Sequence, residues 1–133
     1  MTPKSMRDSR VVTTQLVLPN DTNQLGNLLG GTLMHWMDIV AAICAQRHSG
    51  RVCVTASVDE LTFHQTIGLG EIVTLEASVN RAFRTSMEVG VVVTTQERGG
   101  TSARRANTAF FTFVALDGEN RPDLTCAIRS RHR

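Results

Sequence analysis

The most informative stretch of this sequence is residues 33–45, which would be apolar on every side if it formed a helix. Eleven of its thirteen residues are apolar, so they do not form the single stripe of an ordinary surface helix. A helix without a polar side is stable only when it is buried all round. The sequence therefore predicts one long central helix over residues 32–47, ending near Gly50, with the rest of the chain wrapped around it.

Five other segments alternate apolar and polar residues, which is the pattern of β-strands. They are residues 10–18, 52–58, 71–79, 85–95 and 105–116. Short connections between the later segments favour antiparallel hairpins over helical crossovers. One strand, a helix and then four strands predict an α+β fold, in which a curved antiparallel sheet of about five strands covers the helix.

A length of 133 residues suits one domain, and we expect residues 1–133 to form it, with flexible tails at 1–9 and 125–133. The first residues lack the apolar core of a secretory signal, and no apolar run is long enough to span a bilayer. The three cysteines form no C-x-x-C pair, so a disulfide framework is not expected and a reducing cytoplasm fits best.

Several function classes are not supported by the motifs. The histidines and cysteines lack the spacing of a metal site, and the sequence has no phosphate-binding loop, dinucleotide fingerprint or serine nucleophile motif. The net charge is only +2, and residues 129–133 supply much of it. A short basic tail without tyrosine is usually solvated, so we expect neither nucleic acid nor a membrane as a partner.

Asp38 is the only acidic residue in the apolar helix. Because burial of an unpaired carboxylate is costly, such a residue is normally either paired or functional. One interpretation is a structural aspartate that binds His35, three residues earlier on the same helical face. The other is a catalytic base or nucleophile. Taken alone, the residue leaves both interpretations open.

The loop before the helix offers a complementary group. It is rich in asparagine and glycine and ends in Gly30 and Gly31, at the point where backbone N–H groups lack intrahelical partners. Such amides can stabilise a developing oxyanion, and a glycine pair alone is equally consistent with a simple turn into the helix. Asp38 lies about 10–12 Å further along the rod, too far to share one reacting atom within one straight helix, and a second chain could close this gap.

The residues around this loop resemble the hotdog-fold acyl-CoA thioesterases of the cytosolic acyl-CoA hydrolase branch. The resemblance begins in the stretch Asn23-x-x-Gly26-x-x-x-Gly30-Gly31-x-Leu33-Met34-x-Trp36-Met37-Asp38. It continues in order through Val54-Thr-Ala-Ser-Val-Asp59, Gly70-Glu71, Arg84-Thr-Ser-Met-Glu-Val89 and Ala109-Phe-Phe-Thr-Phe-Val-Ala-Leu-Asp117. It covers about 100 residues in total. The fold that it implies, a long helix wrapped by a curved antiparallel sheet, agrees with the burial argument.

The resemblance implies a hydrolase that releases coenzyme A and a carboxylic acid at a site shared by two subunits. By this resemblance, Asn23 would orient the water or the thioester, and Asp38 would be the general base or the nucleophile. The backbone N–H groups of Gly30 or Gly31 would polarise the thioester carbonyl. No separate cofactor is expected, because coenzyme A is part of the substrate, and no metal is expected.

The resemblance also implies a coenzyme A contact and an assembly. The bend formed by Arg84, Thr85 and Ser86 would contact the pantetheine or the phosphates. We expect a homodimer, commonly built up to a hexamer of three dimers. The alternative is a hotdog protein that binds acyl-CoA without hydrolysing it. A hotdog hydratase is disfavoured, since the loop of residues 20–31 contains no histidine.

Overall fold

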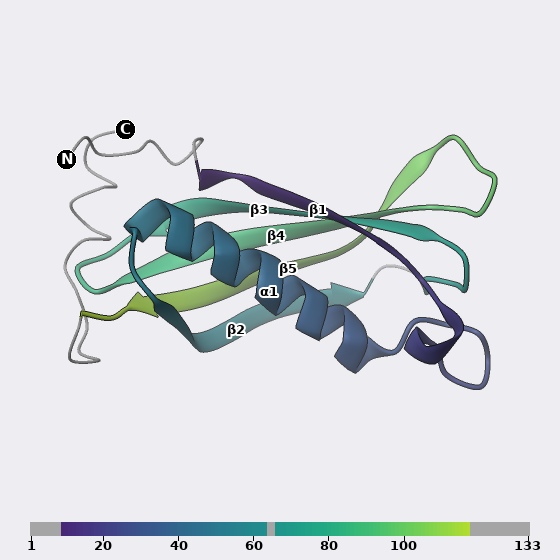
Figure 1. The fold of residues 1–133 in the computed structure, drawn as a ribbon, viewed down its shortest axis with the longest axis horizontal. Coiled ribbons are helices and arrows are strands. Elements are labelled where there is room, and N and C mark those ends of the chain that lie inside the picture. Colours follow the sequence, from purple (N-terminus) through teal and green to yellow (C-terminus); the bar gives the residue numbers. More distant parts are fainter. Residues whose placement is uncertain (1–8, 64–65, 118–133) are drawn as a thin grey trace.

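The computed structural model describes residues 9–63 and 66–117, which form one long helix packed on a five-stranded antiparallel sheet (Figure 1). The elements follow the predicted order, with a short 3-10 turn (Pro19–Asp21) after the first strand. They are β1 (Val11–Leu16), α1 (Gly30–Ser49), β2 (Cys53–Phe63), β3 (Ile72–Ala82), β4 (Ser86–Gln96) and β5 (Ala103–Ala115). The predicted α+β architecture is therefore confirmed.

The strand order across the sheet is β1-β3-β4-β5-β2, and every neighbouring pair is antiparallel. Short hairpins join β3 to β4 and β4 to β5, as predicted, and place these three strands at the centre of the sheet. The chain leaves α1 at the other side of the sheet, so β2 pairs with β5. Two edges result: the short β1 on one side and the longer β2 on the other.

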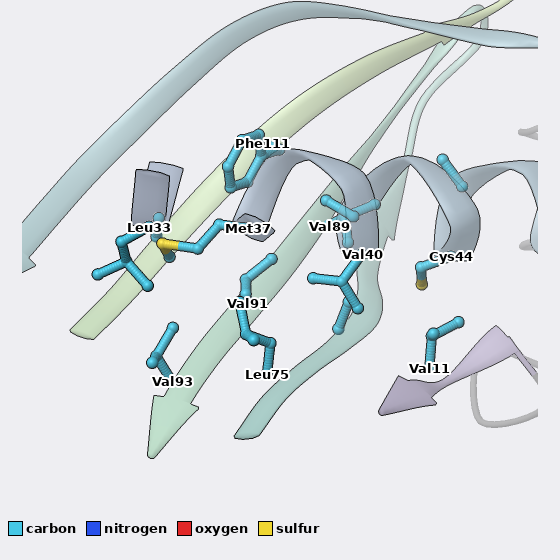
Figure 2. Packing of buried hydrophobic residues seen from close by; sticks show 14 of the residues in the cluster. Val11, Leu33, Met37, Val40, Cys44, Leu75, Val89, Val91, Val93 and Phe111 are labelled. Carbon is cyan, nitrogen blue, oxygen red and sulfur yellow. The ribbon is translucent and has the colours of Figure 1, made fainter. Parts of the chain in front are cut away.

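The core lies between one face of α1 and the inner face of the sheet. Leu33, Met37 and Val40 point from the helix toward the central strands (Figure 2). On β3, β4 and β5 the predicted alternation holds, because apolar side chains facing the helix are buried while their neighbours are partly exposed. Phe111 and Phe113 are both fully buried on β5, with ring centroids 6.2 Å apart.

The helix exceeds its predicted bounds by two residues at each end and stops at Gly50, which adopts the left-handed conformation (φ 70°). The expectation that α1 is buried all round is wrong for a single chain. Ile39 is 44% exposed, and Trp36 and Ile43 are only partly buried. The physical reason is that one sheet covers one side of a rod, so the described part of the chain leaves the outward side of the helix uncovered.

The predicted alternation also fails on β2, where the described side chains of both faces are largely exposed. Val54 is 45% exposed and Val58 is 38% exposed, although both belong to the apolar set of this strand. Among residues 9–63 and 66–117 nothing buries these two side chains, and exposed apolar surface of this kind is typical of contact surfaces.

The tails expected to be flexible lie outside the described residues, apart from Ser9, which is buried against His48. Among the described residues, no helix combines the length and the apolar character that crossing a bilayer requires.

Candidate functional site

Asp38 points from the side of α1 toward β2. Its Oδ1 atom accepts a hydrogen bond of 2.8 Å from the Thr55 hydroxyl. The side chain is partly buried rather than sealed. The structural interpretation that paired Asp38 with His35 is therefore not what the chain adopts, since its hydrogen-bond partner is Thr55 on β2. A carboxylate held at one oxygen is oriented while it stays reachable from outside.

A cleft of about 370 Å³ opens beside this carboxylate. Its polar wall contains Gly31, His35, Asp38 and Thr55, and its apolar wall contains Met34, Val58 and Phe111. The cleft therefore combines an acidic group, the first turn of a helix and an apolar surface. These are the features required to hold a reactive carbonyl group attached to an apolar chain.

The first turn of α1 supplies unused backbone donors. The first intrahelical hydrogen bond runs from the Leu33 N–H to the Leu29 carbonyl, 3.1 Å away, so the amides before Leu33 have no partner within the helix. A Cβ atom on Gly30 or Gly31 would meet no atom within 4 Å. Open space beside both glycines leaves their backbone accessible to a ligand.

Asn23 lies in the loop that leads into this end of the helix, and its carboxamide oxygen is already engaged. Oδ1 accepts hydrogen bonds from the backbone N–H groups of Leu25, at 2.9 Å, and Asn27, at 3.1 Å. Gly26 between them adopts a left-handed φ of 78°, which this tight loop needs. The loop thus leaves the NH₂ group of Asn23 as the part that can act on a ligand, as a donor.

Arg84, Thr85 and Ser86 form the bend between β3 and β4, closed by a 2.7 Å hydrogen bond from the Phe83 N–H to the Ser86 carbonyl. This bend lies at the end of the molecule where α1 finishes, whereas the Asn23 loop lies at the end where α1 begins (Figure 1). One chain therefore brings Gly31 and Asp38 into one cleft but does not bring the Arg84 bend to the Asn23 loop.

The two cysteine thiols within the described residues, Cys44 and Cys53, are unsuited to act as nucleophiles. Burial raises the pKa of Cys44 to about 12, an effect that the Arg47 charge partly offsets. Burial also raises the pKa of Cys53, partly offset by a hydrogen bond with Ser49. Both thiols are therefore protonated at neutral pH. Within residues 9–63 and 66–117, no group of three histidine, cysteine or acidic side chains is placed to hold a metal.

Thr55 was not identified as a site residue from the sequence. It lies in the polar half of a strand pattern, and seventeen residues separate it from Asp38. The one feature of the sequence that could have indicated Thr55 is its chemistry, because a hydroxyl on the strand after the helix can donate a hydrogen bond to the only carboxylate of the helix. Nothing in the sequence fixes which strand hydroxyl meets it.

Comparison with known proteins supports one family. The sequence profile of the thioesterase superfamily matches residues 25–102. Mouse acyl-coenzyme A thioesterase 11 is 44% identical over 107 residues, which are 80% of this chain and 18% of that protein. An uncharacterized acyl-CoA thioester hydrolase of Bacillus subtilis is 42% identical over 116 residues, which are 87% of this chain and 67% of that protein. The chain thus spans less than a fifth of the mouse protein.

Solved structures agree with these relatives. The acyl-CoA hydrolase of Staphylococcus aureus, in complex with butyryl coenzyme A and coenzyme A, has a TM-score of 0.87 at 39% identity, covering 91% of this chain and 74% of that one. An apo-hexameric acyl-CoA thioesterase has a TM-score of 0.88 at 35% identity, covering 93% and 80%.

Variants of the S. aureus enzyme are also among the similar structures. They replace an asparagine, an aspartate and a threonine by alanine, at positions spaced by 15 and 17 residues. The same residue types stand at the same spacings in this chain, as Asn23, Asp38 and Thr55.

Proposed function

This chain belongs to the thioesterase superfamily and has its hotdog fold, and we propose that it hydrolyses acyl-coenzyme A thioesters to coenzyme A and a carboxylic acid. The observation that carries this proposal is the Asp38–Thr55 pair, which opens into a cleft shared with the first turn of α1. Support also comes from the matching spacing of Asn23, Asp38 and Thr55 with the residues varied in the S. aureus enzyme.

Asp38 supplies the group that activates the attack. Thr55 holds Oδ1, so the other oxygen of the carboxylate faces the reaction. As a general base, Asp38 takes a proton from water while the water oxygen bonds to the thioester carbon. The C–S bond then breaks, and the departing thiolate of coenzyme A receives that proton. As a nucleophile, a carboxylate oxygen of Asp38 bonds to the thioester carbon and the C–S bond breaks, which gives an anhydride and the thiolate of coenzyme A. Water then attacks the Asp38 carbonyl carbon of the anhydride, which regenerates the carboxylate and releases the carboxylic acid, and the remaining proton passes to the thiolate. Transfer of ¹⁸O from labelled water into Asp38 in a single turnover distinguishes the second route.

The charge that develops on the carbonyl oxygen needs donors close to it. The backbone N–H groups of Gly30 and Gly31 lie at the positive end of the helix dipole and face open space, so they are suited to this role. Asn23 contributes its NH₂ group, because its oxygen is held by the loop. Asn23 therefore orients the thioester or the water by donating a hydrogen bond.

The complete site requires two copies of the chain. Gly30 and Asp38 are about 12 Å apart along the helix axis, too far to serve one carbonyl group together. Val58, which lines the cleft, and Ile39, on the outward side of α1, are exposed apolar side chains, and β2 is an edge strand of the sheet. A second copy related by a two-fold axis covers both features. We propose a homodimer, assembled further into a hexamer as in a hexameric relative.

The same two-fold axis accounts for the position of the coenzyme A contact. Antiparallel helices place the end of one α1 beside the beginning of the other. The bend of Arg84, Thr85 and Ser86 in one copy thereby approaches the Asn23 loop of its partner. In this arrangement Arg84 neutralises phosphate charge of coenzyme A, while Thr85 and Ser86 provide hydrogen bonds.

Release of free thiol from acetyl-, butyryl- and palmitoyl-coenzyme A tests the proposed reaction. The wild type should hydrolyse at least one of them, and Asp38→Asn should lower kcat by about 10²–10⁴-fold. Glu97→Gln, at an exposed carboxylate in the turn after β4, serves as the matched control and should retain activity. Absence of thiol release from all three substrates overturns the proposal. Saturable binding without turnover would instead assign the chain to non-catalytic acyl-CoA binding.

A further inference from the structure

A second carboxylate, that of Glu71, collects three donors just before β3. Its Oε2 atom accepts the Gly68 N–H at 2.6 Å. Its Oε1 atom accepts the Thr95 hydroxyl at 2.6 Å and Nη2 of Arg104 at 3.1 Å. The side chain of Glu71 is 13% exposed and that of Arg104 is 28% exposed. A carboxylate so enclosed and so fully bonded is held in one position.

This carboxylate fixes both halves of the turn formed by residues 66–70. Gly68 is bound directly, and Nη2 of Arg104 also donates to the Thr66 carbonyl at 3.2 Å. The approach is close, since a Cβ atom at position 68 would lie 3.1 Å from Oε2 of Glu71, so a larger residue there would press on this carboxylate. Arg104 is a basic residue and therefore a candidate for phosphate binding, but its guanidinium group is already engaged with Glu71 and with this turn.

The turn of residues 66–70 is hydrogen-bonded to the loop that carries Asn23. The Leu28 N–H donates to the Ile67 carbonyl at 2.7 Å, and the Leu69 N–H donates to the Gly26 carbonyl at 2.9 Å. A β-bridge joins Asn27 to Gly68. Since the Asn27 N–H is one of the two donors to Asn23 Oδ1, hydrogen bonds and this bridge link the Glu71 carboxylate to the Asn23 carboxamide without a gap.

We propose that Glu71 is a positioning residue for Asn23, acting through the turn of residues 66–70. The inference rests on the proposed function, because it assigns Glu71 a part in placing the Asn23 NH₂ group against the thioester. Glu71 itself touches neither substrate nor water of the reaction. The hydrogen bonds of Glu71 tie the turn of residues 66–70 to Thr95 on β4 and Arg104 on β5, and this turn is hydrogen-bonded to the Asn23 loop. A shift of about 1 Å in such a group can cost about 10²-fold in rate.

A double-mutant cycle tests the coupling. Glu71→Gln keeps the size of the side chain and removes its charge, and we expect kcat for the acyl-CoA that the wild type hydrolyses best to fall about 10- to 100-fold, with KM changed far less. In an Asn23→Ala background the same substitution should cost less than about twofold, because the group it positions is gone. Equal losses in both backgrounds would show a merely structural role and overturn the proposal.

Milder variants keep the test informative if Glu71→Gln unfolds. Thr95→Val removes one hydrogen bond to Glu71 at constant shape and should lower kcat, whereas Thr95→Ser keeps the hydroxyl and should restore it. Thr95 is 1% exposed, so any effect is transmitted through its contacts. Glu76→Gln is the matched control, since Glu76 lies on β3, the strand that begins directly after Glu71, but pairs with Arg10 at the surface. A full loss of activity in Thr95→Ser as well would contradict the role of the hydroxyl.

Amide hydrogen exchange separates this inference from the proposed function. In Glu71→Gln, the amides of Leu25 and Asn27 should exchange faster, while those of the central strand β4 should not change. Unchanged exchange at both amides overturns the positioning role. A wild type without thioesterase activity overturns the proposed function, and the exchange result still decides whether Glu71 holds the Asn23 loop.

Discussion

The two halves of α1 treat polar groups in opposite ways. In the first half, Asp38 is bonded by Thr55 on one side and open to a cleft on the other. In the second half, Ala41 and Cys44 are fully buried, and the polar His48 is sealed and hydrogen-bonded to Ser9 at 3.0 Å. The difference teaches that a polar group in this helix is tolerated either when it is enclosed by partners or when one side stays available to a ligand.

The largest expected effect comes from a carboxylate placed about one helical turn after Asp38, in the buried second half of α1. Ala41→Asp places a charge at a fully buried position without a partner, and we expect the free energy of unfolding to fall by about 3–5 kcal/mol. Urea unfolding followed by circular dichroism measures this. Ala41→Asn, of the same size without the charge, should lose clearly less. Equal stability of Ala41→Asp and the wild type would show that the second half is not sealed.

Removal of the hydroxyl that holds Asp38 tests the first half of α1, where the carboxylate is expected to matter for the rate and not for stability. Thr55→Val deletes the 2.8 Å hydrogen bond and should lower kcat about 10- to 100-fold, because the carboxylate loses its fixed orientation. The free energy of unfolding should change by less than about 1 kcal/mol, since the pair is partly exposed. Thr55→Ser should keep most of the activity. A loss of stability without loss of rate would assign the pair to the fold alone.

The smallest expected effect is on the pH dependence of stability and comes from the thiol of Cys44, in the buried second half of α1. Burial raises the pKa of Cys44 from 9.0 to about 12, so between these values the unfolded chain releases a proton that the folded chain retains. The free energy of unfolding should therefore decrease as the pH rises from about 9 toward 12. Urea unfolding at pH 8 and pH 10 should show a smaller decrease in Cys44→Ala than in the wild type. Identical decreases would mean that Cys44 is not sealed.

Much of the fold could be predicted because it depends on local pattern. The helix and the strands β3 and β5 follow from the spacing of apolar residues and lie within a few residues of their expected bounds. The expected burial of α1 on every side is not found in one chain, where Ile39 is exposed, because the sequence records that a surface is apolar but not what covers it. Exposed Val54 and Val58 on β2 show the same ambiguity.

The site was predictable only in part, for a related reason. Gly31 and Asp38 meet in one cleft because they share a helix, so their proximity follows from helical spacing. Thr55 and Glu71 act through contacts between segments distant in the chain, and no spacing rule indicates such contacts. The roles of Asn23 and Arg84 stay predictions that depend on a second copy.

The way the loop holds the oxygen of Asn23 has an evolutionary consequence. Aspartate has the same shape and accepts the same two backbone hydrogen bonds, so Asn23→Asp would preserve the loop. It would also replace the remaining donor by a negative charge that repels an oxyanion. One base change converts an asparagine codon to an aspartate codon, so under the proposed mechanism a single substitution would separate an intact loop from turnover.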